Sequence, residues 1–233
     1  MMKSEIEGNG DIGGGMKPYF ETENGKLYHG DFMAIMPQLE PVDLILTDPP
    51  YGIGYTGCSL SKRKGLGVIH NGIVGDKNGI DLSTILNAKC DVVVFGANKF
   101  PEQLPKRGRW FCWDKRICES ADRMKGSSFE LAWRNVDSGF DHMFRIMHGG
   151  VVNSDGGKRV HPTQKPINLM MRIINEHYPH AKNVLDPFVG SGTTPIACER
   201  LCLRWVGIEI DEKYCEIAAK RIESEASQLK LFN

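Results

Sequence analysis

The sequence lacks several features that would assign it to whole classes of protein. No apolar run approaches the roughly 18 residues of a membrane span, and residues 1–20 contain no apolar segment like that of a secretory signal. The 7 cysteines include no C-x-x-C pair, and we find no partners for them in a metal site. We therefore expect a cytoplasmic protein with reduced thiols, no membrane segment and no metal.

The chain also lacks net charge, because 29 Lys and Arg residues balance 29 Asp and Glu residues. The charges are unevenly distributed. Residues 1–51 carry 3 basic and 9 acidic side chains, whereas residues 101–165 carry 12 basic and 8 acidic ones. Residues 52–76 add the basic run Lys62-Arg63-Lys64. Basic charge in the middle of the chain is compatible with contacts to phosphates.

Short apolar runs alternate with segments of helical periodicity. This pattern predicts an α/β fold, with a mostly parallel sheet covered by helices on both faces. We expect strands at residues 26–31, 42–47, 91–96, 109–113, 182–186 and 204–210. We expect helices at residues 32–39, 166–178, 190–201 and 211–226.

Three stretches fall outside this alternation. Residues 1–25 are polar and glycine-rich, and we expect a flexible leader there. Residues 26–233 are expected to form one domain, which contains a mobile loop at residues 52–76 and an insertion at about residues 114–160. Loops on a rigid sheet often carry function, so both segments are candidates for substrate contact.

Two signatures overlap in "LILTDPPYGIGYTG" (residues 44–57). The glycines at 52, 54 and 57 match a dinucleotide fingerprint, but such a fingerprint must open directly into a helix. Here Asp48, Pro49 and Pro50 intervene after the strand, and "CSLSKRKGLG" follows the last glycine. We therefore interpret these glycines as loop residues with conformational freedom.

The other signature is the DPPY segment, Asp48-Pro49-Pro50-Tyr51, which follows a buried strand. The two prolines restrict the backbone and offer no N–H, so this turn presents hydrogen-bond acceptors only. Tyr51 adds a flat aromatic surface beside them. Such a set suits a planar ring with an exocyclic amino group, although a simple tight turn would have the same residues.

A second motif, "VLDPFVGSGTT" (residues 184–194), supports the ligand-binding interpretation. A strand ends in an acid and turns through glycines into a helix, whose N-terminal N–H groups bind anions. The next strand ends at Glu209, where an acid is placed to hold ribose hydroxyls. The loop has neither the last glycine of the NAD pattern nor the lysine of a P-loop. We therefore expect a nucleoside that carries an amino-acid tail.

Together, "TDPPYG", "HPTQKP" (residues 161–166), "DPFVGSGTT" and "VGIEID" closely resemble the amino-group DNA methyltransferases that use S-adenosylmethionine. The DPPY segment precedes the cofactor loop, an order similar to that of the β group of N6-adenine and N4-cytosine enzymes. The resemblance spans roughly residues 26 to 222. It implies a Rossmann-like methyltransferase fold with a seven-stranded sheet and a circularly permuted motif order.

The resemblance also implies roles for individual residues. Asp48 and the Pro49 carbonyl would accept hydrogen bonds from the target amino group, with Pro50 holding the turn and Tyr51 stacking on the extruded base. The cofactor would lie against Asp186 at its ammonium, Glu209 at its ribose and Asp31 at its adenine. Its methionine end would contact Phe188, Gly190, Ser191, Gly192 and Thr193, and Lys165 would face its carboxylate.

The expected activity is methylation of adenine N6 at a specific site in double-stranded DNA, after base flipping. The insertion would read the sequence, with Arg116, Arg123, Arg134 and Arg145 as candidate readers. The alternatives are N4-cytosine methylation, an RNA or protein-amine methyltransferase, and a non-catalytic DNA-binding paralogue. The resemblance also allows a homodimer and a place in restriction-modification.

Overall fold

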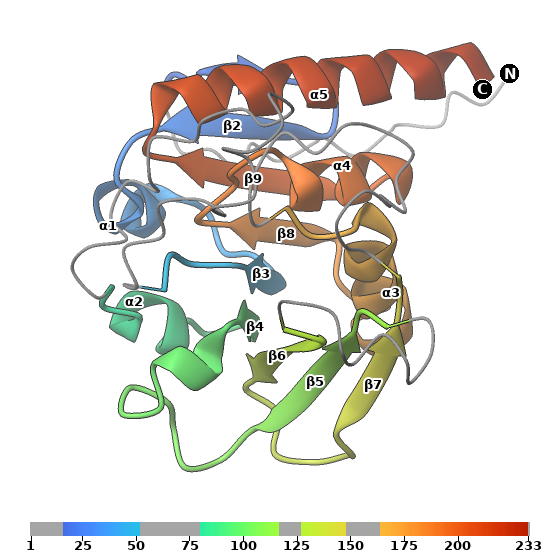
Figure 1. The fold of residues 1–233 in the computed structure, drawn as a ribbon. Helices are drawn as coiled ribbons and strands as arrows, with labels where there is room; N and C mark the ends of the chain where they lie inside the picture. Colours follow the sequence, from blue (N-terminus) through green and yellow to red (C-terminus); the bar gives the residue numbers. More distant parts are fainter. Residues whose placement is uncertain (1–15, 52–79, 117–126, 148–163, 233) are drawn as a thin grey trace, which may run out of the picture.

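The computed structural model describes residues 16–51, 80–116, 127–147 and 164–232. These residues form one nine-stranded sheet with the strand order β1-β2-β9-β8-β3-β4-β6-β5-β7 (Figure 1). The strands are β1 Phe20–Glu21, β2 Gly25–His29, β3 Leu44–Thr47, β4 Asp91–Phe95, β5 Arg109–Asp114, β6 Phe129–Arg134, β7 His142–Arg145, β8 Asn183–Asp186 and β9 Arg204–Glu209.

The expected α/β fold with a mostly parallel sheet is confirmed, but the sheet has nine strands instead of seven. Strands β2, β9, β8, β3 and β4 run parallel to one another, and β6 then enters antiparallel between β4 and β5. Strands β6 and β7 both lie within the range expected to be an insertion. Their sequences, FELAWR and HMFR, lack the regular alternation of apolar and polar residues that predicts a strand.

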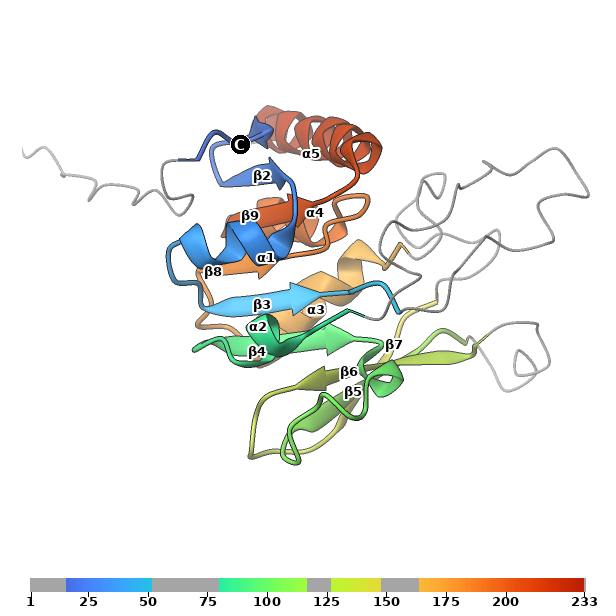
Figure 2. The same cartoon turned by 90° about the vertical axis from the view of Figure 1, so that its left-hand side faces the viewer.

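Helices cover both faces of the sheet, as Figure 2 shows. The short helices α1 (Phe32–Ile35) and α2 (Ser83–Leu86) lie on one face, and α3 (Ile167–His177), α4 (Thr193–Arg200) and α5 (Glu212–Phe232) lie on the other. Strand β3 shows why both faces are apolar: Leu44 and Leu46 join the core under α3–α5, while Ile45 joins the core under α1 and α2.

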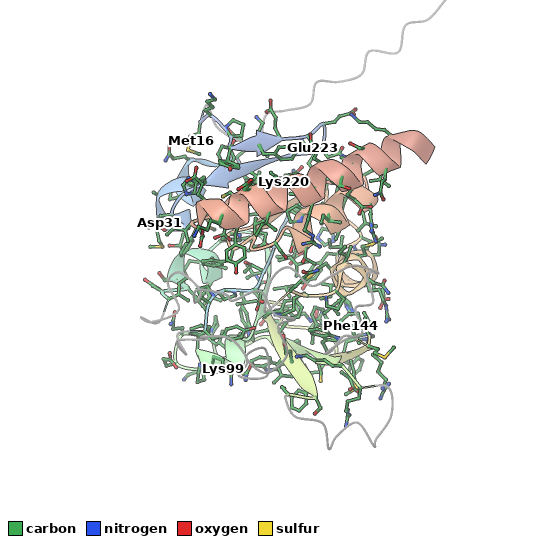
Figure 3. The ribbon with its side chains drawn as sticks, turned by 45° about the horizontal axis from the view of Figure 1, so that its top comes forward. Met16, Asp31, Lys99, Phe144, Lys220 and Glu223 are labelled. Atoms are coloured by element: carbon green, nitrogen blue, oxygen red, sulfur yellow. The ribbon has the colours of Figure 1, made fainter. Side chains whose placement is uncertain are left out.

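Helix α5 is amphipathic and six residues longer than expected at its C-terminal end. Its buried face carries Cys215, Ala218 and Ile222 at helical spacing, while Lys220 and Glu223 are exposed on its outer face (Figure 3). None of the described helices has the length and hydrophobicity needed to cross a bilayer.

The parallel strands bring several sequence motifs to one edge of the sheet. The carboxyl ends of β2, β9, β8, β3 and β4 meet there because these strands share one direction. The residues that end or follow them are Asp31, Glu209, Asp186, Asp48 and Gly96. Ligands in open parallel sheets bind beyond this edge.

The structure corrects one expectation about DNA-reading arginines. Arg134 is only 7% exposed: its guanidinium lies 4.6 Å from the Phe111 ring and donates a 2.9 Å hydrogen bond to the Phe140 carbonyl. A side chain packed in this way cannot reach a base, so that expectation is wrong. The Arg116 guanidinium pairs with Asp114, and Arg145 is largely exposed. Arg123 lies outside the described residues.

A buried carboxylate attaches the N-terminal hairpin to the sheet. Glu199 of α4 is 3% exposed and accepts hydrogen bonds from the Thr22 hydroxyl, from Asn24 Nδ2 at 2.7 Å and from Trp205 Nε1 at 2.8 Å. Thr22 and Asn24 belong to the turn between β1 and β2, and Trp205 belongs to β9. One side chain of α4 therefore accepts hydrogen bonds from two other segments, the β1–β2 turn and β9.

We expect Glu199→Ala to lower the free energy of unfolding by about 3 kcal/mol, because the donors of a buried site would lose their acceptor. Glu199→Gln keeps a carbonyl acceptor and should cost about 1 kcal/mol. Urea denaturation followed by circular dichroism measures both values. Equal stability of the alanine variant and the wild type would show that these hydrogen bonds contribute nothing.

Candidate active site

The DPPY segment turns away from the sheet directly after β3. The Tyr51 hydroxyl donates a 2.5 Å hydrogen bond to Asp48 Oδ1, so the aromatic ring and the carboxylate form one unit. The Tyr51 ring lies against Gly96 at the end of β4, where an added Cβ would lie 2.0 Å from the ring. Gly96 also has a φ of 64°, so this position requires glycine on both grounds. Gly96 is not among the site residues expected from the sequence.

Lys165, expected beside the cofactor carboxylate, has its ammonium at the DPPY segment. Its side chain is 4% exposed, and Nζ makes an ion pair with Asp48 Oδ2 and lies 3.1 Å from Glu130 Oε2. Glu130 lies on β6 and also pairs with Lys115, which follows β5. Lys165 borders the pocket described below as well, so its contact with the cofactor carboxylate stays a prediction.

Burial and neighbouring charges both shift the pKa values of Asp48, Tyr51, Lys165 and Glu130. Burial raises the pKa of Asp48, an effect that the Lys165 ammonium opposes, and burial together with Asp48 raises the pKa of Tyr51 well above its usual value. Burial alone would lower the pKa of Lys165, but Asp48 and Glu130 raise it well above the usual value. Burial likewise disfavours ionised Glu130, yet Lys165 and Lys115 bring its pKa down to about 2. Lys165 and Glu130 are therefore both charged at neutral pH.

The glycine loop, residues 190–193, follows β8 and leads into α4. Gly190 and Gly192 have φ values of 54° and 87°, and Gly192 is the N-cap of α4. The Gly190 N–H donates a 2.8 Å hydrogen bond to Glu209 Oε2, which fixes the loop to the end of β9. The first N–H groups of a helix have no intrahelical partner and form an anion-binding site.

Two buried carboxyl groups lie beside the glycine loop. Asp186 accepts a 2.7 Å hydrogen bond from the Thr47 hydroxyl, and burial raises its pKa to about 6. Burial raises the pKa of Glu209 to about 7, although the Asp211 and Gly190 N–H groups oppose this shift. Each group therefore gains its negative charge close to neutral pH, where a bound cation or hydroxyl group would stabilise it.

One pocket joins the two motifs. It is lined by Asp48 and Lys165 on one side and by Asp186, Phe188 and the residues of the glycine loop except Gly192 on the other. The Phe188 ring packs on Phe32 of α1 with 4.8 Å between ring centroids. Carboxylates and a helix N-terminus in the same pocket suit the ammonium and carboxylate of an amino-acid zwitterion.

Six of the expected site residues lie outside the lining of this pocket, namely Asp31, Pro49, Pro50, Tyr51, Gly192 and Glu209. Glu209 contacts the glycine loop through its carboxylate. Asp31 is the exposed N-cap of α1 and accepts a 2.9 Å hydrogen bond from the Met33 N–H (Figure 3). Tyr51 lies beyond Asp48, against Gly96. Glu209, Asp31 and Tyr51 thus end or follow strands at the sheet edge where the pocket lies.

Comparison with known proteins identifies the family. A family model described as DNA methylase, for N6 and N4 methyltransferases, matches residues 97–220, more than half of the chain. The chain belongs to this family. Its activity is therefore DNA methylation, with S-adenosylmethionine as the methyl donor.

One relative is similar over nearly the whole chain. The type II methyltransferase M2.LlaDCHI of Lactococcus lactis subsp. cremoris is 26% identical over an alignment 259 positions long, which covers 91% of this chain and 94% of that protein. M2.DpnII of Streptococcus pneumoniae is 49% identical, but over only 65 residues, which are 28% of this chain and 24% of that protein.

A solved structure has the same fold. The PvuII DNA methyltransferase, described as cytosine-N4-specific, matches 92% of this chain and 95% of its own chain, with a TM-score of 0.57 and 16% identity. This confirms the Rossmann-like methyltransferase fold.

One group of described side chains has the composition of a metal site. His142, Glu176 and His177 bring their ligand atoms within 4.8 Å of one another. Two guanidinium groups adjoin them: Arg172 pairs with Glu176 at 2.6 Å, and Arg134 Nη1 lies 3.5 Å from His177 Nδ1. A cation would be repelled there, and a guanidinium donating to Nδ1 leaves the His177 proton on Nε2, where no lone pair remains for a metal. We assign no metal site to this group.

Gly96→Ala tests the contact between β4 and Tyr51. The added methyl group would displace the Tyr51 ring, and we expect the turnover number for DNA methylation to fall about tenfold or more, since misplaced catalytic groups have effects of this size. The strained φ should also cost about 1–2 kcal/mol of stability.

Gly139→Ala is the matched control. Gly139 has a φ of 92°, but an added Cβ there meets only the Arg134 guanidinium at 3.7 Å. This variant should lose a similar amount of stability and keep wild-type turnover. Radiolabelled methyl transfer and urea denaturation measure the two effects, and unchanged turnover in Gly96→Ala would refute the role of this contact.

Proposed function

We propose that this protein methylates the N6 amino group of adenine at a specific site in double-stranded DNA, after the base is flipped out of the helix. The observation that carries the proposal is the pocket in which Asp48 faces the glycine loop. A base within a duplex cannot enter such a pocket, so extrusion at a cost of a few kcal/mol is part of the proposal.

The DPPY segment would activate the target amine. An exocyclic amino group is a poor nucleophile because its lone pair is delocalised into the ring. The Asp48 carboxylate and the Pro49 carbonyl would accept its two hydrogens and draw the nitrogen toward tetrahedral geometry. Pro50 would keep the turn rigid, and the Tyr51 ring would stack on the base.

Asp48 would also stabilise charge in the transition state. As the nitrogen acquires the methyl group and the carbon–sulfur bond of the donor breaks, the nitrogen becomes positively charged, and it then releases one proton to water to become a neutral amine. A carboxylate fixed beside this nitrogen offsets the developing charge without reorganisation, which is worth most in a site with little water. The Tyr51 hydroxyl bond and the Lys165 ion pair hold Asp48 in place before substrate arrives.

The cofactor would lie across the glycine loop. Bound S-adenosylmethionine supplies an activated methyl group on a sulfonium. Asp186 would face its ammonium, the glycine loop and Phe188 its methionine end, Glu209 its ribose and Asp31 its adenine. The chemistry of these groups fits, because two buried acids near neutral pKa and a helix N-terminus are available at one edge.

The choice of base rests on Asp48. An aspartate at this position of the motif is commoner in adenine enzymes, and serine is commoner in cytosine enzymes, so N4-cytosine methylation is the second candidate. DNA contacts are assigned to residues 52–76, where the sequence predicts a loop, and to the insertion. The loop and parts of the insertion lie outside the described residues. A homodimer, a cytoplasmic location and a role in restriction-modification belong to the same proposal.

The product identifies the base. The protein is incubated with S-adenosylmethionine and unmethylated bacterial DNA, and the digested nucleosides are analysed by mass spectrometry. N6-methyladenine is the expected product. N4-methylcytosine would establish the second candidate, and the absence of any methylated base from DNA would refute the proposal.

Asp48→Ala should reduce the turnover number by a factor of about a thousand or more, because it removes the acceptor that stabilises the transition state. Affinity for S-adenosylmethionine, measured by isothermal titration calorimetry, should stay within a few-fold of the wild-type value. Asp137→Ala is the control, since Asp137 is an exposed aspartate that pairs with Arg107 at 3.6 Å. Near-normal turnover in Asp48→Ala would rule out this mechanism.

Cofactor affinity should depend on pH through Asp186 and Glu209. With pKa values of about 6 and 7, both groups are mainly protonated at pH 5 and mainly ionised at pH 8. Only the ionised forms attract an ammonium or accept from both ribose hydroxyls, so affinity should rise about tenfold or more between pH 5 and pH 8.

Glu209→Gln should flatten the upper part of this pH dependence and weaken binding at pH 8. Glu225→Gln is the control, because Glu225 is a partly buried glutamate whose ion pair with Arg200 at 2.8 Å belongs to a different part of the fold. Calorimetric titrations at several pH values give the dissociation constants. A Glu209→Gln variant with the wild-type profile would exclude Glu209 from the cofactor site.

A further inference from the structure

Glu130 is a charged residue that neither the DPPY segment nor the glycine loop includes. It lies on β6, which enters the sheet between β4 and β5. Ala132, two residues further along β6, belongs to the core under α3–α5. Because side chains two residues apart in a strand share a face, Glu130 lies on that same face of the sheet. Lys165, which immediately precedes Pro166 and α3, approaches from this side.

Four charges form a line that ends at the catalytic carboxylate. Lys115 pairs with Glu130 Oε1, Lys165 Nζ lies 3.1 Å from Glu130 Oε2, and Lys165 Nζ pairs with Asp48 Oδ2. The side chains are 20%, 27%, 4% and 16% exposed in the order Lys115, Glu130, Lys165 and Asp48. The charges sum to zero, so each ion is neutralised by a neighbour, as burial requires.

Lys165 has two carboxylates to satisfy with one ammonium. Its Nζ also lies 5.3 Å from the centre of the Phe95 ring, which limits its movement on a further side. An ammonium held between Glu130 and Asp48 fixes the position of the Asp48 carboxylate. Because Glu130 shares the ammonium, Lys165 neutralises the charge on Asp48 only in part.

We propose that Glu130 is a positioning residue that acts through Lys165 to hold the Asp48 carboxylate in place and to prevent the ammonium from pairing fully with it, so that the carboxylate stays a strong acceptor for the target amine. The proposal rests on the function assigned to Asp48 above. Without Glu130, the ammonium would keep its ion pair with Asp48 and would no longer be shared between these two carboxylates, so it would pair more closely with Asp48. A fully neutralised Asp48 would be a weaker acceptor for the target amine and would offset less of its developing charge.

Glu130→Gln tests this role with a side chain of nearly the same shape. At saturating DNA and cofactor, kcat should fall at least tenfold, while the dissociation constant for S-adenosylmethionine should change less than twofold. Glu130→Asp keeps the charge one methylene further from Lys165 and should have an intermediate kcat. Glu225→Gln, a partly buried glutamate in the separate ion pair with Arg200, should keep the wild-type kcat.

The pH profile of kcat separates positioning from a role in stability alone. Four titratable groups face or influence Asp48, namely Tyr51, Lys165, Glu130 and Asp186. The negative charge of Glu130 raises the pKa of Asp48, so its removal should move the acid limb of the profile to lower pH. The acid limb of Glu130→Asp should stay in place.

Two results would overturn the proposal. If Glu130→Gln has a lower melting temperature but an unchanged kcat per folded molecule and an unchanged acid limb, Glu130 is a structural residue only. The second result comes from NMR titration of the Lys165 side-chain amine in the apo protein, which requires no activity. This amine should titrate at lower pH in Glu130→Gln than in the wild type, and an identical titration would overturn the coupling.

The NMR measurement also separates this proposal from the assigned function. A wild-type protein that methylates no DNA would refute the role of Asp48 as an amine acceptor. A shifted Lys165 titration in that protein would still support the coupling of Glu130 to Asp48, whereas loss of kcat together with a shifted titration supports both.

Discussion

The parallel pairing of β3 with β8 on one side and β4 on the other is the constraint on which the site depends. These short strands are apolar on both faces, so they are stable only between two helical layers. Because all three run in one direction, their last residues are neighbours although they are far apart in the chain. Asp48, Asp186 and Gly96 thereby become parts of one site.

Each of the four charged side chains at the DPPY segment, Lys115, Glu130, Lys165 and Asp48, has an oppositely charged partner. Lys165 balances Asp48, and Lys115 balances Glu130. A buried network of this kind is poor evidence for stability, since its desolvation can outweigh the attraction between the ions. Its value lies in geometry, because it fixes the acceptor that the reaction uses before the substrate binds.

Asp186 and Glu209 show the opposite arrangement. Burial raises the pKa of both, so the folded apo protein binds their protons more tightly than the unfolded chain does. Their contribution to stability is therefore greatest below about pH 4 and is lost as the pH rises through 6 and 7. At neutral pH the folded protein holds carboxylates that a cofactor with an ammonium and hydroxyl groups would stabilise. At this sheet edge, the ionised carboxylates that favour cofactor binding at neutral pH therefore lower the stability of the folded apo protein.

The sequence by itself determined the local features: the buried strands, the glycine turn into α4, the rigid DPPY segment and the acid at the end of β9. Strand periodicity, proline restriction and helix starts are encoded by neighbouring residues, and the order of these motifs indicated the family. The tertiary structure alone decided that Glu130 contacts Lys165, that Gly96 must accommodate Tyr51 and that Arg134 packs in the core. These contacts depend on where β6 enters the sheet, and its sequence FELAWR carries no regular pattern to reveal it. Contacts between distant segments are set by strand order and packing, which local periodicity does not encode.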